Sequence, residues 1–147
     1  MPDEVLIGGK SKAVVERFLE KTWLARIATV DASTGCPHVV PVWYGWDGES
    51  VWISSYSSTR KIRELKSNPN CSIVVDAAEG EEGVSAVLFE GKAELVTAPR
   101  DFLREKITWV YARYLGPEGV LAPDPQRWLD SPENLLIKLT PEKIYAW

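Results

Sequence analysis

The sequence is poor in the side chains that most often build a catalytic or metal centre. It has one histidine and two cysteines among 147 residues. Cys36 and Cys71 lie too far apart in sequence for a CxxC redox motif, and we interpret each as a small buried hydrophobic residue. His38 is expected at the start of a strand, as an exposed or hydrogen-bonded residue rather than a base. We therefore predict no metal site and no Ser-His-Asp triad.

Long apolar runs and a basic balance are also missing. No apolar run approaches the ~20 residues that a membrane span needs, which predicts no membrane partner. The first twelve residues carry acids where a signal peptide would carry cations, so we expect a cytoplasmic protein. The formal net charge of −4 argues against nucleic-acid binding, because phosphate contacts need a basic face.

The common nucleotide-binding and acid–base patterns are absent as well. Neither GxGxxG nor GxxxxGK[ST] occurs, and the acidic residues show no spacing typical of general acid–base catalysis. No catalytic residue can be named from the sequence. If the protein is an enzyme, a cofactor is expected to carry the chemistry.

What the sequence does contain is typical of one globular domain spanning residues 1–147. Hydrophobic residues make up 45% and charged residues 26%. A chain of this length buries roughly 70% of the surface that its unfolded form exposes. The seven tryptophans are unusual for this size, and we expect several of them to line a pocket or a subunit interface.

Periodicity and turn residues predict an antiparallel, mainly β fold with helices. Alternating or apolar runs predict strands over residues 24–30, 38–46, 51–55, 71–75, 84–96, 135–139 and 144–147. Helices are expected over residues 12–21, from Ser58 or Thr59 to 67, and from 99 to a stop at Gly116-Pro117. Residues 77–83 read as an acidic loop, and 116–132 as a long connection. Consecutive strands joined by short turns favour an antiparallel barrel over a parallel sheet.

One short segment has the features of an anion site. Ser54 and Ser55 end a predicted strand, and Arg60-Lys61 opens the following helix. Hydroxyls, free backbone N–H groups, the positive end of a helix dipole and two cations would then lie together, as a phosphate ester requires. The alternative is a surface helix whose basic residues are simply solvated. Similarly, Pro41 in mid-strand indicates either an edge strand or a ligand close to that backbone.

The run VWISSYSSTRKIRELKSNP, residues 51–69, resembles the phosphate-binding segment of the pyridoxamine 5′-phosphate oxidase-like, FMN-binding split-barrel family. In that family a strand ends in two residues that contact the cofactor phosphate, and a Ser-Arg-Lys or similar triplet opens a helix that ends in Asn-Pro. The stretches 24–30, 35–43, 89–95 and 136–147 are similar to other parts of the family's barrel. The resemblance covers about residues 18–147.

The resemblance implies an antiparallel split β-barrel (α+β) of about six to seven strands with three peripheral helices. It implies a homodimer with the cofactor at the subunit interface, its phosphate at the start of the second helix and its ring against the backbone of residues 39–44. The second subunit would complete the pocket through Trp147 or the loop around Trp128. The cofactor-binding residues implied are Val40, Pro41, Val42, Trp43, Ser54, Ser55, Thr59, Arg60, Lys61 and Trp147.

The sequence also departs from the oxidase that gives the family its name. Val39 and Tyr44 stand where that enzyme has an arginine and a lysine facing the flavin, and Ala86 stands where it has a glutamine. Its substrate-binding C-terminal extension has no counterpart here. We therefore expect no oxidation of pyridoxamine phosphate. The more apolar pocket resembles shorter members of the family, which include FMN-binding and deazaflavin-dependent reductases.

The sequence thus predicts an FMN-binding oxidoreductase acting on an unknown small, flat molecule. One alternative is a deazaflavin-dependent reductase, in which the longer acidic tail of the coenzyme would also use Arg60 and Lys61, with Arg63 or Lys66. A second is a flavin- or haem-binding module without turnover. A third is a barrel that has lost its cofactor and serves as an interaction domain.

Overall fold

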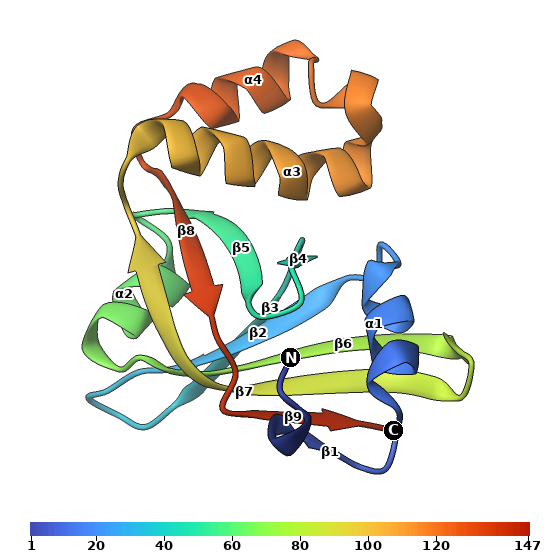
Figure 1. Ribbon diagram of the computed structural model, residues 1–147. Coiled ribbons are helices and arrows are strands. Elements are labelled where there is room, and N and C mark those ends of the chain that lie inside the picture. Colours follow the sequence, from blue (N-terminus) through green and yellow to red (C-terminus); the bar gives the residue numbers. More distant parts are fainter.

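A computed structural model describes all residues, 1–147, and contains nine strands and four α-helices (Figure 1). The helices are α1 (Lys12–Glu20), α2 (Arg60–Ser67), α3 (Arg100–Gly119) and α4 (Pro123–Asp130), with a 3₁₀ turn at Asp3–Val5. The strands are β1 (Leu6–Ile7), β2 (Ala25–Val30), β3 (Pro37–Val42), β4 (Gly45–Trp46), β5 (Val51–Tyr56), β6 (Asn70–Glu81), β7 (Val84–Val96), β8 (Asn134–Leu139) and β9 (Lys143–Ala146).

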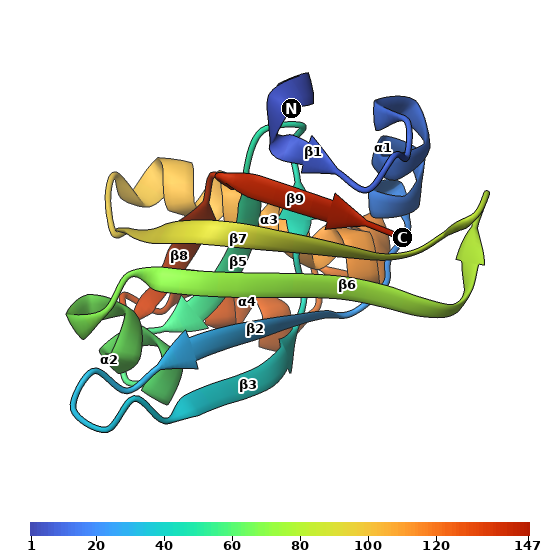
Figure 2. The same ribbon diagram turned by 90° about the horizontal axis from the view of Figure 1, so that it is seen from below.

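The strands form one open, mainly antiparallel sheet in the order β3-β2-β6-β7-β8-β5-β4. The long strand β7 belongs to both halves of this sheet. It pairs with β6 up to Lys92 and with β8 from Ala93 onward. Figure 2 shows β3, β2, β6, β7 and β9 side by side. The only parallel pair is β1 with β9. This arrangement confirms the split β-barrel that the sequence predicted.

The main core fills the barrel beneath helix α1. Alternate residues of β2, namely Ala25, Ile27 and Thr29, are buried, as expected for a strand with one face on a core. Helix α1 begins after the N-cap Ser11, whose hydroxyl accepts from the Val14 N–H at 3.4 Å. Its buried face, formed by Val15, Phe18 and Leu19, closes one side of the core.

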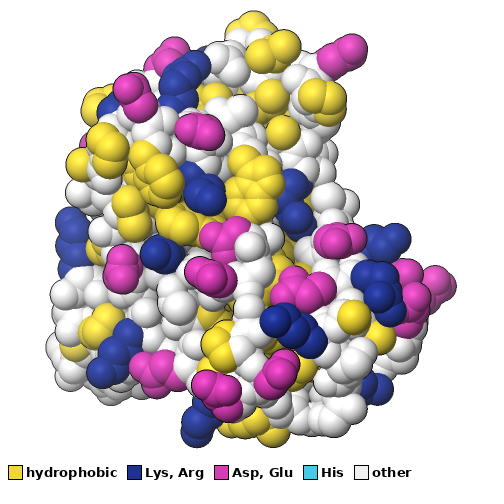
Figure 3. Space-filling model, viewed as in Figure 1, with side chains coloured by type: hydrophobic (Ala, Val, Ile, Leu, Met, Phe, Trp, Pro, Cys, Tyr) yellow, Lys and Arg dark blue, Asp and Glu magenta, His cyan; other side chains and the backbone are white.

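A second, smaller core joins the α3–α4 layer to the barrel. Leu103 and Ile107 of α3 and Leu129 of α4 pack with Trp52 of β5 and Leu136 of β8. Figure 1 shows α3 and α4 as a layer over the β5–β8 end of the barrel. Hydrophobic side chains gather on the face between this layer and the barrel, next to Lys and Arg side chains (Figure 3). The Lys106 ammonium of α3 lies 4.7 Å from the centre of the Trp52 ring of β5.

The extent of the regular structure exceeds the sequence prediction in two places. The predicted acidic loop 77–83 is wrong over residues 77–81, because β6 continues to Glu81 and the chain turns at Glu82-Gly83. Both turn residues have positive φ, and a register shift between Asp76 and Glu81 absorbs the irregular pairing. The predicted connection 116–132 contains α4, which starts at Pro123, a favourable residue for a first helical turn.

Other predictions differ from the structure in smaller details. The expected strand 38–46 is split, since β3 ends at Val42 and β4 starts at Gly45. Gly116 breaks α3 as expected, with φ 81°, although a further helical turn reaches Gly119. Cys71 is buried, whereas Cys36 is exposed, so the interpretation of both as buried is wrong for Cys36. The count is nine strands and four helices rather than six to seven and three.

None of the helices combines the length and the apolar character needed to cross a bilayer.

Candidate functional site

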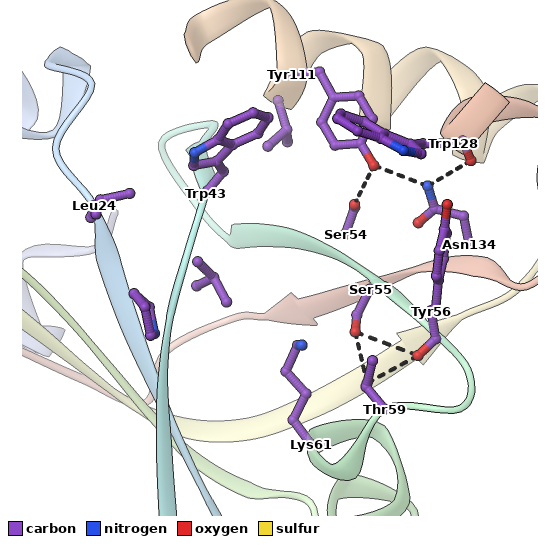
Figure 4. Close-up of a pocket in the computed structure, with 13 residues that line it drawn as sticks. Leu24, Trp43, Ser54, Ser55, Tyr56, Thr59, Lys61, Tyr111, Trp128 and Asn134 are labelled. Atoms are coloured by element: carbon purple, nitrogen blue, oxygen red, sulfur yellow. Dashed lines mark hydrogen bonds between the residues drawn. The ribbon is translucent and has the colours of Figure 1, made fainter. Parts of the chain in front are cut away.

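The main cavity opens between the end of β3, strand β5, the start of α2 and the α3–α4 layer (Figure 4). Its volume of about 540 Å³ lies in the range typical of sites for small ligands and cofactors. The lining residues are Leu24, Pro41, Val42, Trp43, Ser54, Ser55, Tyr56, Thr59, Lys61, Val110, Tyr111, Trp128 and Asn134. We call the part near Lys61 and Thr59 the anion end, and the part near Trp43, Tyr111 and Trp128 the aromatic end.

The strand and helix that form the anion end are consecutive in the chain. Strand β5 pairs with β8 in a register that sets Ser55 opposite Leu135 and Tyr56 opposite Asn134. After Tyr56 the chain turns, with the Thr59 N–H donating to the Tyr56 carbonyl at 3.1 Å, and α2 begins at Arg60. The turn therefore places the first residues of α2 at the anion end of the cavity.

Lys61 is the only charged residue that lines the cavity. Figure 4 shows its side chain rising from α2 with the ammonium group directed into the space beside Ser55. The ammonium forms no salt bridge. Its partial burial lowers the pKa of Lys61, because the charged form loses hydration. An unpaired, partly desolvated cation in a cavity favours an anionic ligand.

Hydroxyl groups and an uncapped helix end surround this cation. The Ser55 and Thr59 hydroxyls lie 2.9 Å apart, and Thr59 donates to the Tyr56 carbonyl at 3.0 Å. Although Thr59 is the N-cap residue of α2, its side chain forms no capping hydrogen bond. The first N–H groups of the helix therefore lack a partner from the cap, and the positive end of the helix dipole faces the anion end.

Arg60 lies outside the cavity. Its Nε donates to Glu64 Oε1 at 3.0 Å, and the residue lines a separate small pocket with Asp31 and Glu64. His38 Nδ1 is also 3.0 Å from Glu64 Oε1, without hydrogen-bond geometry. Successive helical residues point about 100° apart, so Arg60 and Lys61 face different sides of α2. The structure thus separates two cations that the sequence analysis had grouped.

Three aromatic side chains form the aromatic end. Trp43 stacks on Tyr114 with ring centres 4.9 Å apart and an angle of 5° between the rings. Trp43 also makes an edge-to-face contact with Tyr111, with ring centres 5.8 Å apart, and Trp128 makes a second such contact with Tyr111 at 5.9 Å. These contacts fix the rings and leave a cavity wall without charge.

A hydrogen-bond chain runs behind this wall. Asn134, which is fully buried, donates from Nδ2 to the Tyr111 hydroxyl at 3.1 Å and to the Trp128 carbonyl at 3.0 Å. The Tyr111 hydroxyl lies 3.1 Å from the Ser54 hydroxyl. Asn134 Oδ1 has no hydrogen-bond partner. The chain links α3, α4, β8 and β5 around one corner of the cavity.

The structure brings most of the residues predicted for the cofactor site together in one cavity: Pro41, Val42, Trp43, Ser54, Ser55, Thr59 and Lys61. Pro41 also lies on β3, the edge strand of the sheet, which confirms the edge-strand explanation for this proline, while a ligand close to its backbone stays a prediction. Val40 packs against the barrel core instead. Trp147 lies on the outer face of β6 and β7, half-exposed, near Ser85 and Ala86.

Several lining residues were not predicted. Tyr111 falls in the helix expected from residue 99 to Gly116, and Asn134 precedes the strand expected over residues 135–139, so neither was predicted to line a cavity. Trp128 was expected near a partner's pocket, yet it lines the cavity of its own chain. The sequence does contain one signal for this helix: Pro125, Trp128 and Leu129 have helical spacing after Pro123. It would have placed Trp128 on a helix, though not in this cavity.

Comparison with known proteins gives the family. The family model described as pyridoxamine 5′-phosphate oxidase matches residues 11–147. The chain therefore belongs to the pyridoxamine 5′-phosphate oxidase family. A search of curated proteins found no significant match.

Solved structures agree on the fold. The conserved hypothetical protein Rv2991 from Mycobacterium tuberculosis is 24% identical with a TM-score of 0.76, over 94% of this chain and 84% of that one. A protein described as an F420 reductase is 25% identical with a TM-score of 0.70, over 88% of this chain and 94% of that one. General Stress Protein 26 from Bacillus anthracis is 17% identical with a TM-score of 0.68, over 92% of each chain.

The Asn134–Tyr111–Ser54 chain predicts unequal effects for two Tyr→Phe changes. Tyr111→Phe removes a hydroxyl bonded to Asn134 and Ser54 and leaves a buried N–H of Asn134 without an acceptor. We expect a loss of about 1–2 kcal/mol in unfolding free energy, measured by urea denaturation. Tyr56→Phe is the matched control, since the Tyr56 hydroxyl has no hydrogen bond in the protein, and should change stability little. Equal effects of the two changes would contradict this account of the chain.

Proposed function

We propose that the cavity binds FMN and that the protein is an FMN-dependent oxidoreductase acting on a small molecule. The observation that carries the proposal is Lys61, an unpaired ammonium directed into the cavity. Beside it lie two hydroxyls and the uncapped start of α2. Ammonium, hydroxyl and backbone N–H donors converging on one point suit a phosphate monoester. Membership of the family supports a flavin-type cofactor.

In this proposal Lys61, Ser55 and Thr59 hold the phosphate, and the ring rests beside residues 41–43 at the end of β3. Pro41 has no N–H to satisfy, so a ring can cover its backbone without burying an unpaired donor. When bound, the flavin supplies hydride or electron transfer, which side chains cannot provide. The chain binds and orients the reactants, while Trp43 and Tyr111 keep water from one side of the cavity.

Pyridoxamine phosphate is not the proposed substrate. The cavity contains one cation, Lys61, and FMN would already occupy it. A second phosphate would enter an aromatic end that has no charged lining residue, where a dianion is strongly disfavoured. The substrate is therefore proposed to be a small molecule without a phosphate.

The role of Lys61 predicts a selective loss of affinity. Lys61→Met keeps the length of the side chain and removes its charge. We expect the dissociation constant for FMN to rise about 10- to 100-fold, as for loss of a hydrogen bond to a charged group. Riboflavin, which has the same ring and sugar alcohol without the phosphate, should bind both forms equally. Quenching of flavin fluorescence measures both affinities.

Lys66→Met is the control for this substitution, because Lys66 is exposed at the other end of the same helix. It should leave the FMN affinity unchanged. If Lys61→Met weakened riboflavin and FMN to the same degree, the phosphate would not lie at Lys61 and the assignment would be wrong.

A deazaflavin coenzyme is the second candidate, favoured by the likeness to the protein described as an F420 reductase. The geometry supports it less, since two of the cations proposed for the longer acidic tail, Arg60 and Arg63, are engaged elsewhere. Arg60 bonds Glu64, and Arg63 donates to the Ser58 carbonyl at 2.8 Å, both outside the cavity. His38 also lies outside the cavity, so it offers no ligand for a haem there.

Parallel titrations with FMN and coenzyme F420 separate the two candidates. We expect tighter binding of FMN, and removal of Arg60 and Arg63 together should not weaken it. Binding of F420 alone, weakened by that double substitution, would replace the first proposal with the second. The chromophores allow both titrations to be followed by absorbance.

We also propose that the FMN-loaded protein is a homodimer with the cavity at the subunit interface. Support comes from exposed apolar side chains near the cavity and on the sheet face, with Leu24 44%, Val39 63% and Trp147 55% exposed. We expect sedimentation equilibrium to give twice the chain mass in the presence of FMN. A monomer that still binds FMN tightly would contradict this proposal and would leave Trp147 without a role at the cofactor.

A further inference from the structure

The corner of the aromatic end contains a hydrogen-bond acceptor without a partner. Both amide hydrogens of Asn134 are donated, to Tyr111 and to the Trp128 carbonyl. A carbonyl can only accept, so Nδ2 must face Trp128 and the orientation of the amide is fixed. Asn134 lines the cavity, and its Oδ1, which neighbouring atoms cover almost completely, has no hydrogen-bond donor in the protein.

The backbone of Asn134 is held in place, and its amide is held by the hydrogen bonds to Tyr111 and Trp128. Asn134 opens β8 opposite Tyr56, and the Arg100 guanidinium donates to its carbonyl at 2.9 Å. The residue is 0% exposed. Buried acceptors without partners are uncommon, because such a group loses its hydration without compensation. A donor supplied by a ligand is the compensation that this position lacks.

A donor lies on the same wall. Because the Tyr111 hydroxyl accepts from Asn134, its own hydrogen can be donated to Ser54 Oγ, 3.1 Å away. The Ser54 hydroxyl hydrogen is then free to point into the cavity, which Ser54 lines. The aromatic end thus presents a fixed acceptor and an adjustable donor.

The charge distribution restricts what can bind there. Lys61 is at the opposite end, and the walls of the aromatic end are Trp43, Tyr111 and Trp128. An ionic group would lose hydration without gaining a counter-charge. A flat, neutral ring would instead pack against aromatic faces and edges.

We propose that the aromatic end is the substrate subsite, and that it takes a planar, uncharged aromatic molecule carrying an O–H or N–H group. This group donates to Asn134 Oδ1 after a small shift of the side chains that cover the atom in the empty cavity. This inference rests on the proposed function, in which FMN occupies the anion end and the side of β3. Asn134 is then the residue that determines specificity, and Tyr111 is a positioning residue that holds its amide.

Three naphthalene probes of similar shape test the proposal by equilibrium dialysis against the FMN-loaded protein. 2-Naphthol is neutral and has a donor, 2-methoxynaphthalene lacks the donor, and 2-naphthoate is charged. We expect 2-naphthol to bind about tenfold more tightly than 2-methoxynaphthalene, the effect of one hydrogen bond to a buried acceptor. Binding of 2-naphthoate should be weaker than that of both neutral probes.

Two substitutions assign the preference to its residue. Asn134→Leu should abolish the difference between 2-naphthol and 2-methoxynaphthalene, whereas Lys66→Met, on the exposed side of α2 outside the cavity, should preserve it. Equal binding of the two neutral probes to the unaltered protein would overturn the proposal, even if Asn134→Leu does not fold. Retention of the preference in Asn134→Leu would overturn it too.

Displacement of FMN by 2-naphthol would show that the aromatic end belongs to the cofactor ring, which also overturns the proposal. The probes are tested on the FMN-free protein as well. If FMN does not bind but the preference for 2-naphthol is present there and absent in Asn134→Leu, the proposed cofactor fails while the specificity of this subsite stands.

Discussion

Strand β7 imposes the constraint on which the rest of the structure depends. One continuous set of backbone hydrogen bonds must serve two halves of the sheet, with β6 and β9 in one half and β8 in the other. The change of partner falls at Gly91 to Ala93, where a Cβ on Gly91 would lie 3.2 Å from both Leu139 and the Thr140 carbonyl. Because β7 places β8, and β8 pairs with β5, this one strand sets the position of Ser54, Ser55 and Asn134 around the cavity.

The anion end was predictable from sequence because it is local. Ser54, Ser55, Thr59 and Lys61 lie within one strand–turn–helix segment, so spacing alone brings them together. The sequence grouped Arg60 with Lys61, whereas the structure places Arg60 outside the cavity that Lys61 lines, because adjacency in sequence does not determine which side of a helix each residue occupies. That distinction needs Glu64, whose buried carboxylate holds Arg60 away from the cavity.

The aromatic end could not be predicted, for the opposite reason. Tyr111, Trp128 and Asn134 come from α3, α4 and β8, and only tertiary packing makes them neighbours. Helix α4 was not predicted, because Pro123 and Pro125 are typical of loops. Proline is nevertheless compatible with the first turn of a helix, where these two residues lie. The prediction of the fold class was still correct, because the fold class depends on the alternating pattern of the strands and on the order of the hairpins.

The place of α3 and α4 in the chain has a consequence for how relatives of this protein can diverge. The whole segment between Val96 and Asn134 leaves from one strand of a hydrogen-bonded pair and returns to the other. Insertions, deletions and substitutions in this segment leave the pairing of β7 with β8 unchanged, because long connections between paired strands generally tolerate such changes. Natural variation can therefore change the side of the cavity that α3 and α4 form, while the side formed by β5 and α2 stays the same.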